Sequence, residues 1–271
     1  MRILIATDGS PHSDLAVHMG ACIGQVTKVE LTVLTVISRE PQREQASAIL
    51  SRAKAILRNQ AEVVKKSIRV GQPAEQILRE AKAGGYELII VGDHPRHGLS
   101  LRLIAPTTEW LIARKPCPVL IAREQACLLQ RVLVCEGGCD PSLLSRLNAR
   151  LAPLVAAFAE LTVLHVMSQI AASPIAQDWE LEAEADELIE RHTPEGKMLE
   201  ADLALLQPSN LKLQAKVRHG LVVEEVLVEA KSGDYDLVVI GAHQTQGWER
   251  YLLDDLAHEI ISKVDRPVLV V

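Results

Sequence analysis

Two polar loops hold the residues of this chain whose types and spacing could do chemistry. The first comprises residues 7–11, Thr-Asp-Gly-Ser-Pro, and the second residues 92–98, Gly-Asp-His-Pro-Arg-His-Gly; each follows a short apolar run. If those runs are parallel strands, both loops lie beyond the carboxyl ends of a sheet, where open α/β sheets bind ligands. Ser10 followed by Pro11 is typical of a helix start. The sequence therefore predicts a ligand site at these loops.

The histidines of the second loop offer a metal site as an alternative. His94 and His97 flank Arg96, and His243 is the counterpart of His94 in the second half of the chain. A zinc site needs three or four converging ligands, and Asp93 is the one acid at a recognisable spacing. We therefore expect solvated loop histidines and no metal.

The cysteines favour reduced thiols over a disulfide framework. They are odd in number and scattered, as expected in a cytosol: Cys22, Cys117, Cys127, Cys135 and Cys139. Three residues separate Cys135 from Cys139, which is not the Cys-x-x-Cys spacing, so a redox pair is the lesser alternative. The chain also has no Gly-x-Ser-x-Gly or Gly-Lys-Thr motif, so nothing argues positively for catalysis.

Composition narrows the classes of partner. The net charge of −6 disfavours nucleic acid. No apolar run reaches the ~18 residues that a membrane span needs. Met1 and Arg2 lead straight into an apolar strand pattern rather than a signal peptide. We expect a cytoplasmic protein that contacts neither nucleic acid nor membrane.

The elements that position the loops occur twice. Residues 82–92 and 231–241 are near copies at an offset of 149, which is the size of a domain. We predict one domain over residues 1–125 and a second over 130–271, joined by a linker at Gln125–Gln130.

Each copy alternates apolar, β-branched runs with helical patterns. In the first copy the predicted strands are Arg2–Ala6, Glu30–Val36, Val64–Val70, Glu87–Val91 and Pro118–Ala122, with helices over 11–24, 43–60, 73–83 and 107–114. In the second copy the strands are Arg131–Cys135, Glu160–Val166, Leu211–Val217, Asp236–Ile240 and Pro267–Val271. Nearly continuous apolar strands separated by helices indicate two tandem doubly wound α/β domains, each a five-stranded, mainly parallel sheet with helices on both faces.

The copies differ in one insertion. Their offset rises from 130 at Ser10 and Asp140 to 149 at Gly71 and Gly220, so the second copy has about nineteen extra residues. This segment includes the acid-rich stretch Trp179–Arg191, whose apolar residues repeat at helical spacing. We expect an extended amphipathic helix with a solvated acidic face, or alternatively a surface that docks a partner. Asp140 is the expected cap of the first helix of the second copy.

Several segments resemble universal stress proteins, and the chain resembles a tandem member of that family. They are residues 5–10, 71–77, 87–92 and 116–121 in the first half, with weaker counterparts at 236–241 and 266–270. The resemblance implies a non-enzymatic stress-response regulator that acts through protein partners. It also implies pairing of the domains through Pro118–Ala122 and Pro267–Val271 as a pseudo-dimer, which could pair again into a homodimer.

One branch of that family binds ATP through a glycine pattern after the fourth strand. The pattern is Gly, two residues, Gly, nine residues, then Gly followed by Ser or Thr. The first copy keeps Gly92 but has Pro95 at the second glycine and Ala105-Pro106 at the final pair. Each proline removes an N–H donor. Thr107 or Thr108 could supply the hydroxyl if the loop shifts.

The second copy departs further from the pattern. It keeps Gly241 but has Gln244 at the second glycine and Asp254-Asp255 at the final pair, where carboxylates would cap the helix and repel a triphosphate. Gly137 or Gly138 replaces Asp8, and the nearest acid, Glu136, comes early.

The resemblance thus implies degraded ATP motifs in both copies. The alternative is a sensor that binds ATP, AMP or another adenine nucleotide in the first copy alone, and a slow ATPase is the one candidate activity. The expected site residues are Thr7, Asp8, Val36, Gly92, His94, Arg96 and Thr107.

Overall fold

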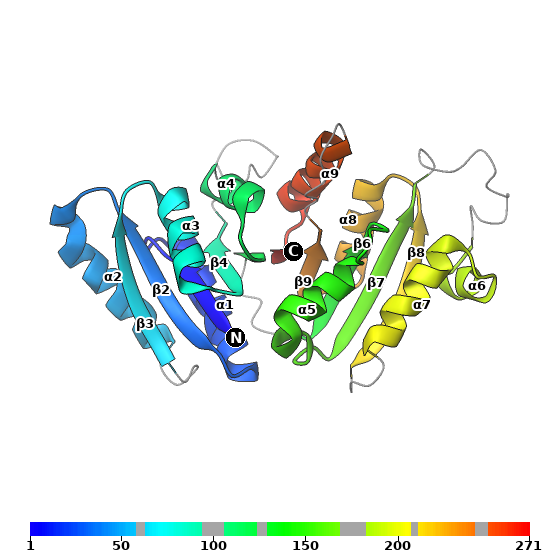
Figure 1. The fold of residues 1–271 in the computed structure, drawn as a ribbon, viewed down its shortest axis with the longest axis horizontal. Coiled ribbons are helices and arrows are strands. Elements are labelled where there is room, and N and C mark those ends of the chain that lie inside the picture. Colours follow the sequence, from blue (N-terminus) through cyan, green and yellow to red (C-terminus); the bar gives the residue numbers. More distant parts are fainter. Residues whose placement is uncertain (58–62, 94–105, 124–128, 169–182, 207–210, 242–248) are drawn as a thin grey trace. The chain divides into compact units, whose positions relative to one another are not determined.

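The computed structural model describes residues 1–57, 63–93, 106–123, 129–168, 183–206, 211–241 and 249–271. The chain forms two compact units. Unit 1 comprises residues 1–129 and 265–270, and unit 2 comprises residues 130–264 and 271. Each unit is a sheet with helices on both faces (Figure 1).

Unit 1 is built on a parallel sheet in the order β3-β2-β1-β4-β5. Its strands are β1 (Arg2–Ala6), β2 (Glu30–Ile37), β3 (Val63–Val70), β4 (Leu88–Gly92) and β5 (Val119–Ala122). β10 (Val268–Val270) from the end of the chain pairs antiparallel with β5, with Leu269 opposite Leu120. All four residues of β5 are buried, because helices cover both faces of this sheet.

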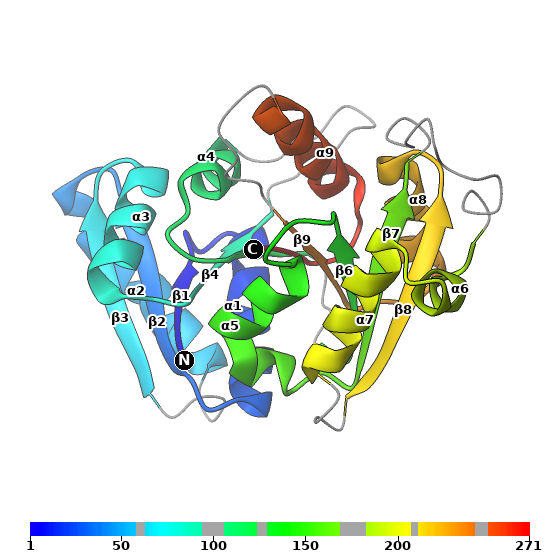
Figure 2. The ribbon, with the colours of Figure 1, turned by 45° about the vertical axis from the view of Figure 1, so that its right-hand side comes forward.

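The helices of unit 1 form two pairs. They are α1 (Pro11–Val26), α2 (Arg43–Ile56), α3 (Pro73–Gly84) and α4 (Pro106–Arg114), with a short 3-10 turn, η1, at Glu40–Gln42. α1 packs against α2, and α3 packs against α4, which puts one pair on each face of the doubly wound sheet (Figure 2). α1 begins at Pro11, and its cap Ser10 accepts a hydrogen bond from the Ser13 N–H.

Unit 2 repeats this arrangement. Its strands are β6 (Arg131–Glu136), β7 (Glu160–Met167), β8 (Lys212–His219) and β9 (Leu237–Ile240), in the parallel order β9-β6-β7-β8. Its helices are α5 (Leu143–Val155), α6 (Ala185–Glu190), α7 (Pro194–Leu206), α8 (Val222–Ser232) and α9 (Glu249–Lys263). α5 packs against α7, and α8 packs against α9. The predicted tandem α/β fold is confirmed.

Three local predictions in unit 2 are wrong. The cap of α5 is Ser142, not Asp140, because the Ser142 hydroxyl accepts from the N–H of Ser145 in the first turn. Asp254 and Asp255 do not cap α9, which begins at Glu249 and so places them in its second turn.

The third error concerns the insertion. The predicted helix over Trp179–Arg191 lies partly outside the described residues, and the described helix, α6, starts only at Ala185 and ends at Glu190. The chain reverses at His192, which has a φ of 55°, and Thr193 then caps α7 through a 2.9 Å hydrogen bond from Gly196. Pro194 favours this new helix start over a continuation of α6.

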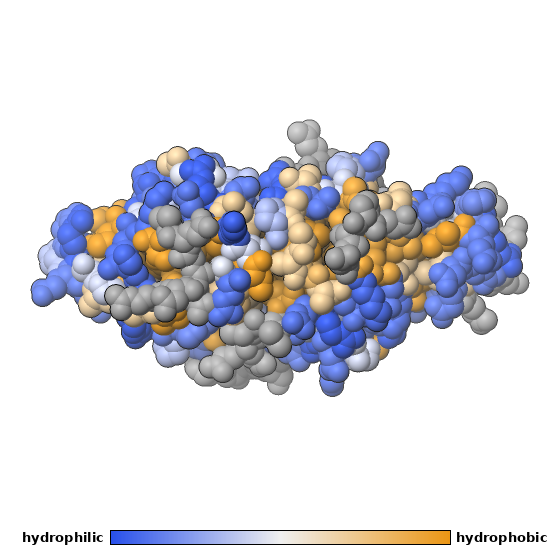
Figure 3. Space-filling model, turned by 90° about the horizontal axis from the view of Figure 1, so that it is seen from below, coloured by the Kyte–Doolittle hydropathy of each residue, from blue (hydrophilic) through white to orange (hydrophobic). Residues whose placement is uncertain are grey.

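Five large apolar side chains are exposed among the described residues. Figure 3 shows one face, on which hydrophilic residues lie around the apolar surface. The exposed large apolar residues are Val26, Val70, Leu205, Leu221 and Val228. Single apolar side chains of this kind are normal on a folded surface and do not by themselves mark a binding site.

Candidate functional site

Four of the predicted site residues lie at one edge of the sheet of unit 1. β1 pairs with both β2 and β4, with Ala6 opposite Leu34 and Ile5 opposite Ile90. Thr7 and Asp8 follow β1, Val36 is near the end of β2, and Gly92 ends β4. Since the strands are parallel, these ends share the carboxyl edge where a ligand of such a sheet binds.

The loop after β1 is held by its own hydroxyl groups. The Thr7 and Ser13 hydroxyl oxygens are 2.9 Å apart, and the Gly9 N–H donates to Thr7 Oγ1 at 3.1 Å. The Ser10 N–H donates to Asp8 Oδ1 at 2.9 Å. Thr7 and Ser13 are buried, whereas Asp8 is exposed at the edge. The sequence prediction omitted Ser13, although its place three residues after a capping serine was a usable signal.

Arg52 reaches this loop from α2. Its Nη2 donates to the carbonyl oxygen of Gly9 at 2.8 Å and to Asp14 Oδ2 at 2.6 Å. The guanidinium therefore joins α2, the loop and the first turn of α1, and it brings a positive charge beside the candidate site. Nothing local in the sequence predicts this contact, because 43 residues separate Arg52 from Gly9.

Gly92 is needed where α1 crosses the end of β4. A Cβ at this position would lie 2.1 Å from the carbonyl oxygen of His12 and 2.9 Å from Ser13 Cα. Both are backbone atoms, which cannot rotate away as a side chain can. The glycine therefore lets the end of β4 approach the start of α1.

The residue after Gly92 forms a buried ion pair. Asp93 and Arg123 are 5% and 3% exposed, and Arg123 Nε donates to Asp93 Oδ2 at 2.7 Å. In the described part of the chain, the other carboxylate oxygen of Asp93 is buried without a hydrogen-bond donor. The ion pair thus links the residue that follows β4 to the residue that follows β5. The sequence prediction did not assign this role to Asp93.

Of the three remaining predicted site residues, the structure describes only Thr107. His94 and Arg96, together with Pro95, lie outside the described residues. Thr107 is half-buried in the first turn of α4, which packs against α3 and β5. Its neighbour Thr108 is buried.

The matching edge of unit 2 contains a buried carboxylate instead of a hydroxyl. Glu136 ends β6, at the position that Thr7 takes after β1. Its Oε2 accepts from the Leu143 N–H at 2.7 Å and its Oε1 from the Gly138 N–H at 3.3 Å. Burial raises the pKa of Glu136, although these backbone donors act in the opposite direction.

A second buried acid lies beside this helix start. The Ser142 hydroxyl donates to Asp202 Oδ1 at 2.5 Å, from the first residue before α5 to the middle of α7. Asp202 is 2% exposed, and burial, with a smaller contribution from the charge of Glu136, raises its pKa to about 6. Two buried acids therefore lie at the start of α5 in unit 2.

Gly241, which follows β9 in unit 2, has no backbone atom as close to it as Gly92 has. A Cβ at Gly241, the counterpart of Gly92, would meet Arg146 Nη2 at 2.9 Å, and this atom is the end of a flexible side chain. α5 therefore does not press its backbone against β9 as α1 does against β4.

The cysteines of the described residues are thiols without a disulfide. Desolvation and the neighbouring Glu136 raise the pKa of Cys135 to about 12, and desolvation also raises the pKa of Cys139. Neither thiol is therefore poised as a thiolate at neutral pH.

A search of the described residues finds no cluster of three His, Cys, Asp or Glu side chains suited to hold a metal ion. Among the same residues, no helix has the length and hydropathy needed to cross a bilayer.

Comparisons with known proteins agree on one family. The model of the universal stress protein family matches residues 1–123 and again residues 129–271. Universal stress protein YxiE of Bacillus subtilis (strain 168) is 29% identical over 145 residues, which cover 98% of that protein and 45% of this chain.

Two solved structures match along nearly the whole chain. A universal stress protein from Archaeoglobus fulgidus DSM 4304 matches with a TM-score of 0.72 and 17% identity, over 99% of this chain and 97% of its own. A functionally unknown protein, PA1789 of Pseudomonas aeruginosa PAO1, matches with a TM-score of 0.71 and 18% identity, over 100% of this chain and 92% of its own. At such low identity these matches establish a shared fold.

Proposed function

Because the chain belongs to the universal stress protein family, we propose that it is a cytoplasmic, non-enzymatic regulator that binds an adenine nucleotide in unit 1 alone. In this proposal unit 2 has lost its nucleotide site and serves the regulatory role through contacts with protein partners. Residues 125–130 link the two domains in this proposal, and no nucleic acid or membrane takes part.

The observation that carries this proposal is the exchange of Thr7 for Glu136 at the same place in the two units. In unit 2 the Glu136 carboxylate accepts from the Leu143 N–H, a donor at the helix start that an anion would otherwise need. In unit 1 the Thr7 hydroxyl contacts Ser13 instead, and the nearby Asp8 carboxylate accepts from the N–H of the cap Ser10. In this proposal the Glu136 carboxylate excludes an anionic ligand from the edge of unit 2.

Electrostatics favour the same choice. A nucleotide in unit 2 would come close to Glu136 and Asp202, both buried where screening by water is weak. At the edge of unit 1 the buried polar side chains of the first loop are hydroxyls, the Asp8 carboxylate is exposed to water, and the Arg52 guanidinium balances the charge of Asp14. A negatively charged phosphate tail is better accommodated there.

The proposed site uses each predicted residue in a different way. Asp8 is exposed at the edge and binds the nucleoside, while the Thr7 hydroxyl keeps the loop in shape. Val36 borders the base, and Gly92 allows the end of β4 to approach the start of α1. Thr107 at the start of α4, with His94 and Arg96, contacts the phosphates. Because Pro95 and Ala105-Pro106 replace the second glycine and the final pair of the family pattern, we expect tighter binding of AMP than of ATP.

We propose no catalytic activity because of the contacts in the loop after β1. The Thr7 and Ser13 hydroxyls contact each other rather than a histidine or carboxylate that could take their proton. ATP turnover is therefore not expected even when the nucleotide is bound.

Isothermal titration calorimetry of the full chain with ATP, ADP and AMP, each with and without Mg²⁺, tests the nucleotide site. We expect saturable binding at about one site per chain, with Asp8→Ala weakening it about tenfold or more, the loss of about one charged hydrogen bond. Asp140→Ala, an exposed acid in the matching loop of unit 2, is the control and should leave the affinity unchanged. Absence of heat with all three nucleotides, or equal effects of the two variants, would overturn the proposed site.

We also propose that the pairing of β5 with β10 couples the domains as a pseudo-dimer. In support, Val268, Leu269 and Val270 are fully buried in that pairing. Val268→Pro should break the strand and split thermal unfolding into two calorimetric transitions. A single transition at the wild-type temperature would contradict this coupling.

A further inference from the structure

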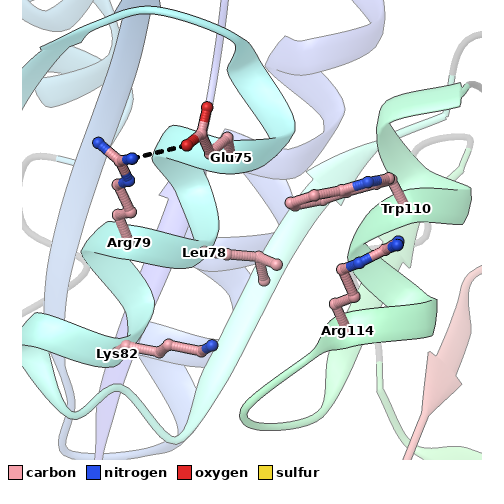
Figure 4. Close-up of a pocket in the computed structure, with 6 residues that line it drawn as sticks. All are labelled: Glu75, Leu78, Arg79, Lys82, Trp110 and Arg114. Carbon is pink, nitrogen blue, oxygen red and sulfur yellow. Dashed lines mark hydrogen bonds and ion pairs between the residues drawn. The ribbon is translucent and has the colours of Figure 1, made fainter.

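A second binding feature lies on unit 1, in the groove between α3 and α4. The groove has a volume of about 380 Å³, within the usual range for binding pockets. Figure 4 shows its lining residues, four from α3 and two from α4: Glu75, Leu78, Arg79, Lys82, Trp110 and Arg114. None of them belongs to the proposed nucleotide site, so an inference about this groove stands apart from that proposal.

The groove is cationic on a chain that is acidic overall. Arg79, Lys82 and Arg114 line it with one carboxylate, Glu75, whereas the whole chain has a net charge of −6. The Lys82 ammonium and the Arg114 guanidinium approach the groove from opposite helices (Figure 4). A local positive field of this kind attracts carboxylates to a surface that otherwise repels them.

The one internal ion pair of the groove is weak enough to be exchanged. Arg79 Nη2 lies 2.7 Å from Glu75 Oε1, but the two side chains are 62% and 45% exposed. An exposed pair at this helical spacing contributes only about 0.3–0.5 kcal/mol. Arg79 can therefore turn to an incoming carboxylate at little cost.

Between the cations the groove has an apolar floor. Leu78 is 5% exposed and points toward the half-buried indole of Trp110 (Figure 4). The Arg114 guanidinium carbon lies 4.6 Å from the centre of the Trp110 ring, so stacking holds this cation in place. Tryptophan and arginine are the side chains most enriched at the energetic centres of protein interfaces.

We propose that this groove binds an acidic peptide segment of a partner protein. Carboxylates of the segment pair with Lys82, Arg79 and Arg114, and an apolar side chain between them packs on Leu78 and Trp110. Guanidinium–carboxylate pairs give the segment a defined orientation. A nucleic acid fits less well, because the overall negative charge of the chain would repel its long phosphate backbone.

The test is calorimetric titration of the full chain with an acetylated, amidated peptide, Gly-Glu-Asp-Leu-Glu-Asp-Leu-Gly. Its control is the same peptide with glutamine and asparagine in place of the acids. We expect saturable binding of the acidic peptide, at least tenfold weaker binding of the amide peptide, and loss of affinity as the salt concentration rises.

Charge-matched variants locate the site. The double variant Lys82→Ala with Arg114→Ala removes two exposed cations from the groove and should weaken binding at least tenfold. Lys65→Ala with Arg43→Ala removes two exposed cations elsewhere on unit 1 and should leave it unchanged. Equal binding of the two peptides, equal effects of the two double variants, no saturable heat, or tighter binding of a single-stranded oligonucleotide would each overturn the proposal.

Discussion

The backbone N–H of Leu143 donates a 2.7 Å hydrogen bond to the carboxylate of Glu136. A side chain from the end of β6 thereby occupies the amino end of α5, where the helix dipole favours negative charge. In unit 1, Thr7 holds this position and its hydroxyl is too short and uncharged to play that part. The two copies of one fold thus differ in the acid at the start of their first helix: Glu136 accepts from the Leu143 N–H in unit 2, whereas Asp8 accepts from the N–H of the cap Ser10 in unit 1.

Replacement of Glu136 by alanine should destabilise unit 2. The Leu143 and Gly138 N–H groups would lose their acceptor, and an unsatisfied buried donor costs about 1–3 kcal/mol. Glu136→Gln keeps an acceptor oxygen and should cost less than the alanine variant. Urea unfolding of the full chain measures both. If alanine and glutamine destabilise equally, the hydrogen bonds are not what the carboxylate contributes.

The stability of unit 2 should fall with rising pH through Asp202. Its pKa is raised from 3.8 to about 6 in the folded chain, so the native state holds its proton over a range where the unfolded state has lost it. The contribution of this group is therefore most favourable below pH ~4 and is lost as the pH rises to ~6. Asp202→Asn should show little gain in unfolding free energy at pH ~4 but up to about 3 kcal/mol at pH ~7.5.

Comparison of variant with wild type at each pH is needed, because other carboxyls titrate in the opposite sense. Lys212 lowers the pKa of Glu160, for example, so that its contribution is lost at low pH. Asp186→Asn, at an exposed position on α6, is the matched control and should change the unfolding free energy by less than about 0.5 kcal/mol. A pH-independent gain for Asp202→Asn would mean that its carboxyl is not buried as described.

Alanine at the two equivalent glycines should have unequal effects. Gly92→Ala would place a Cβ 2.1 Å from the His12 carbonyl oxygen, so either α1 or β4 must move, at a cost of about 1–3 kcal/mol. Gly241→Ala meets only the end of the Arg146 side chain, which can rotate away, so its cost should stay below about 0.5 kcal/mol. Thermal unfolding of the two variants gives the comparison, and equal shifts would contradict the close approach of α1.

The Asp93–Arg123 pair should be costly to break from either side. Removal of one partner leaves a buried, uncompensated charge, so Arg123→Met is expected to cost about 3–5 kcal/mol. The double variant Arg123→Met with Asp93→Asn should be more stable than Arg123→Met alone. The exposed pair of Lys65 and Glu30 is the control, with an expected cost below about 1 kcal/mol for Lys65→Met. If Arg123→Met and Lys65→Met lower the unfolding free energy by similar amounts, burial does not determine the cost of breaking the pair.

Local pattern was a sound guide to the elements of the fold. The predicted strand Arg2–Ala6 has the observed bounds, and the helix after Ser10 begins where the capping residue indicates. Where local signals compete they mislead. Asp140 and Ser142 are both good caps by residue type, and Ser142 is the one whose side chain accepts from the first turn of α5. The apolar spacing over Trp179–Arg191 did not reveal that the chain turns at His192.

The sequence by itself determined the tandem α/β organisation and the edge of each sheet where polar loops gather. Strands buried on two faces are nearly continuous apolar runs, and this pattern is visible along the chain. Only the tertiary structure decided which side chains meet there. Arg52 reaches Gly9 and Asp202 reaches Ser142 from other helices, and Arg123 meets Asp93 from the next strand. Such contacts depend on distances in space between residues far apart in sequence, and no local periodicity encodes them.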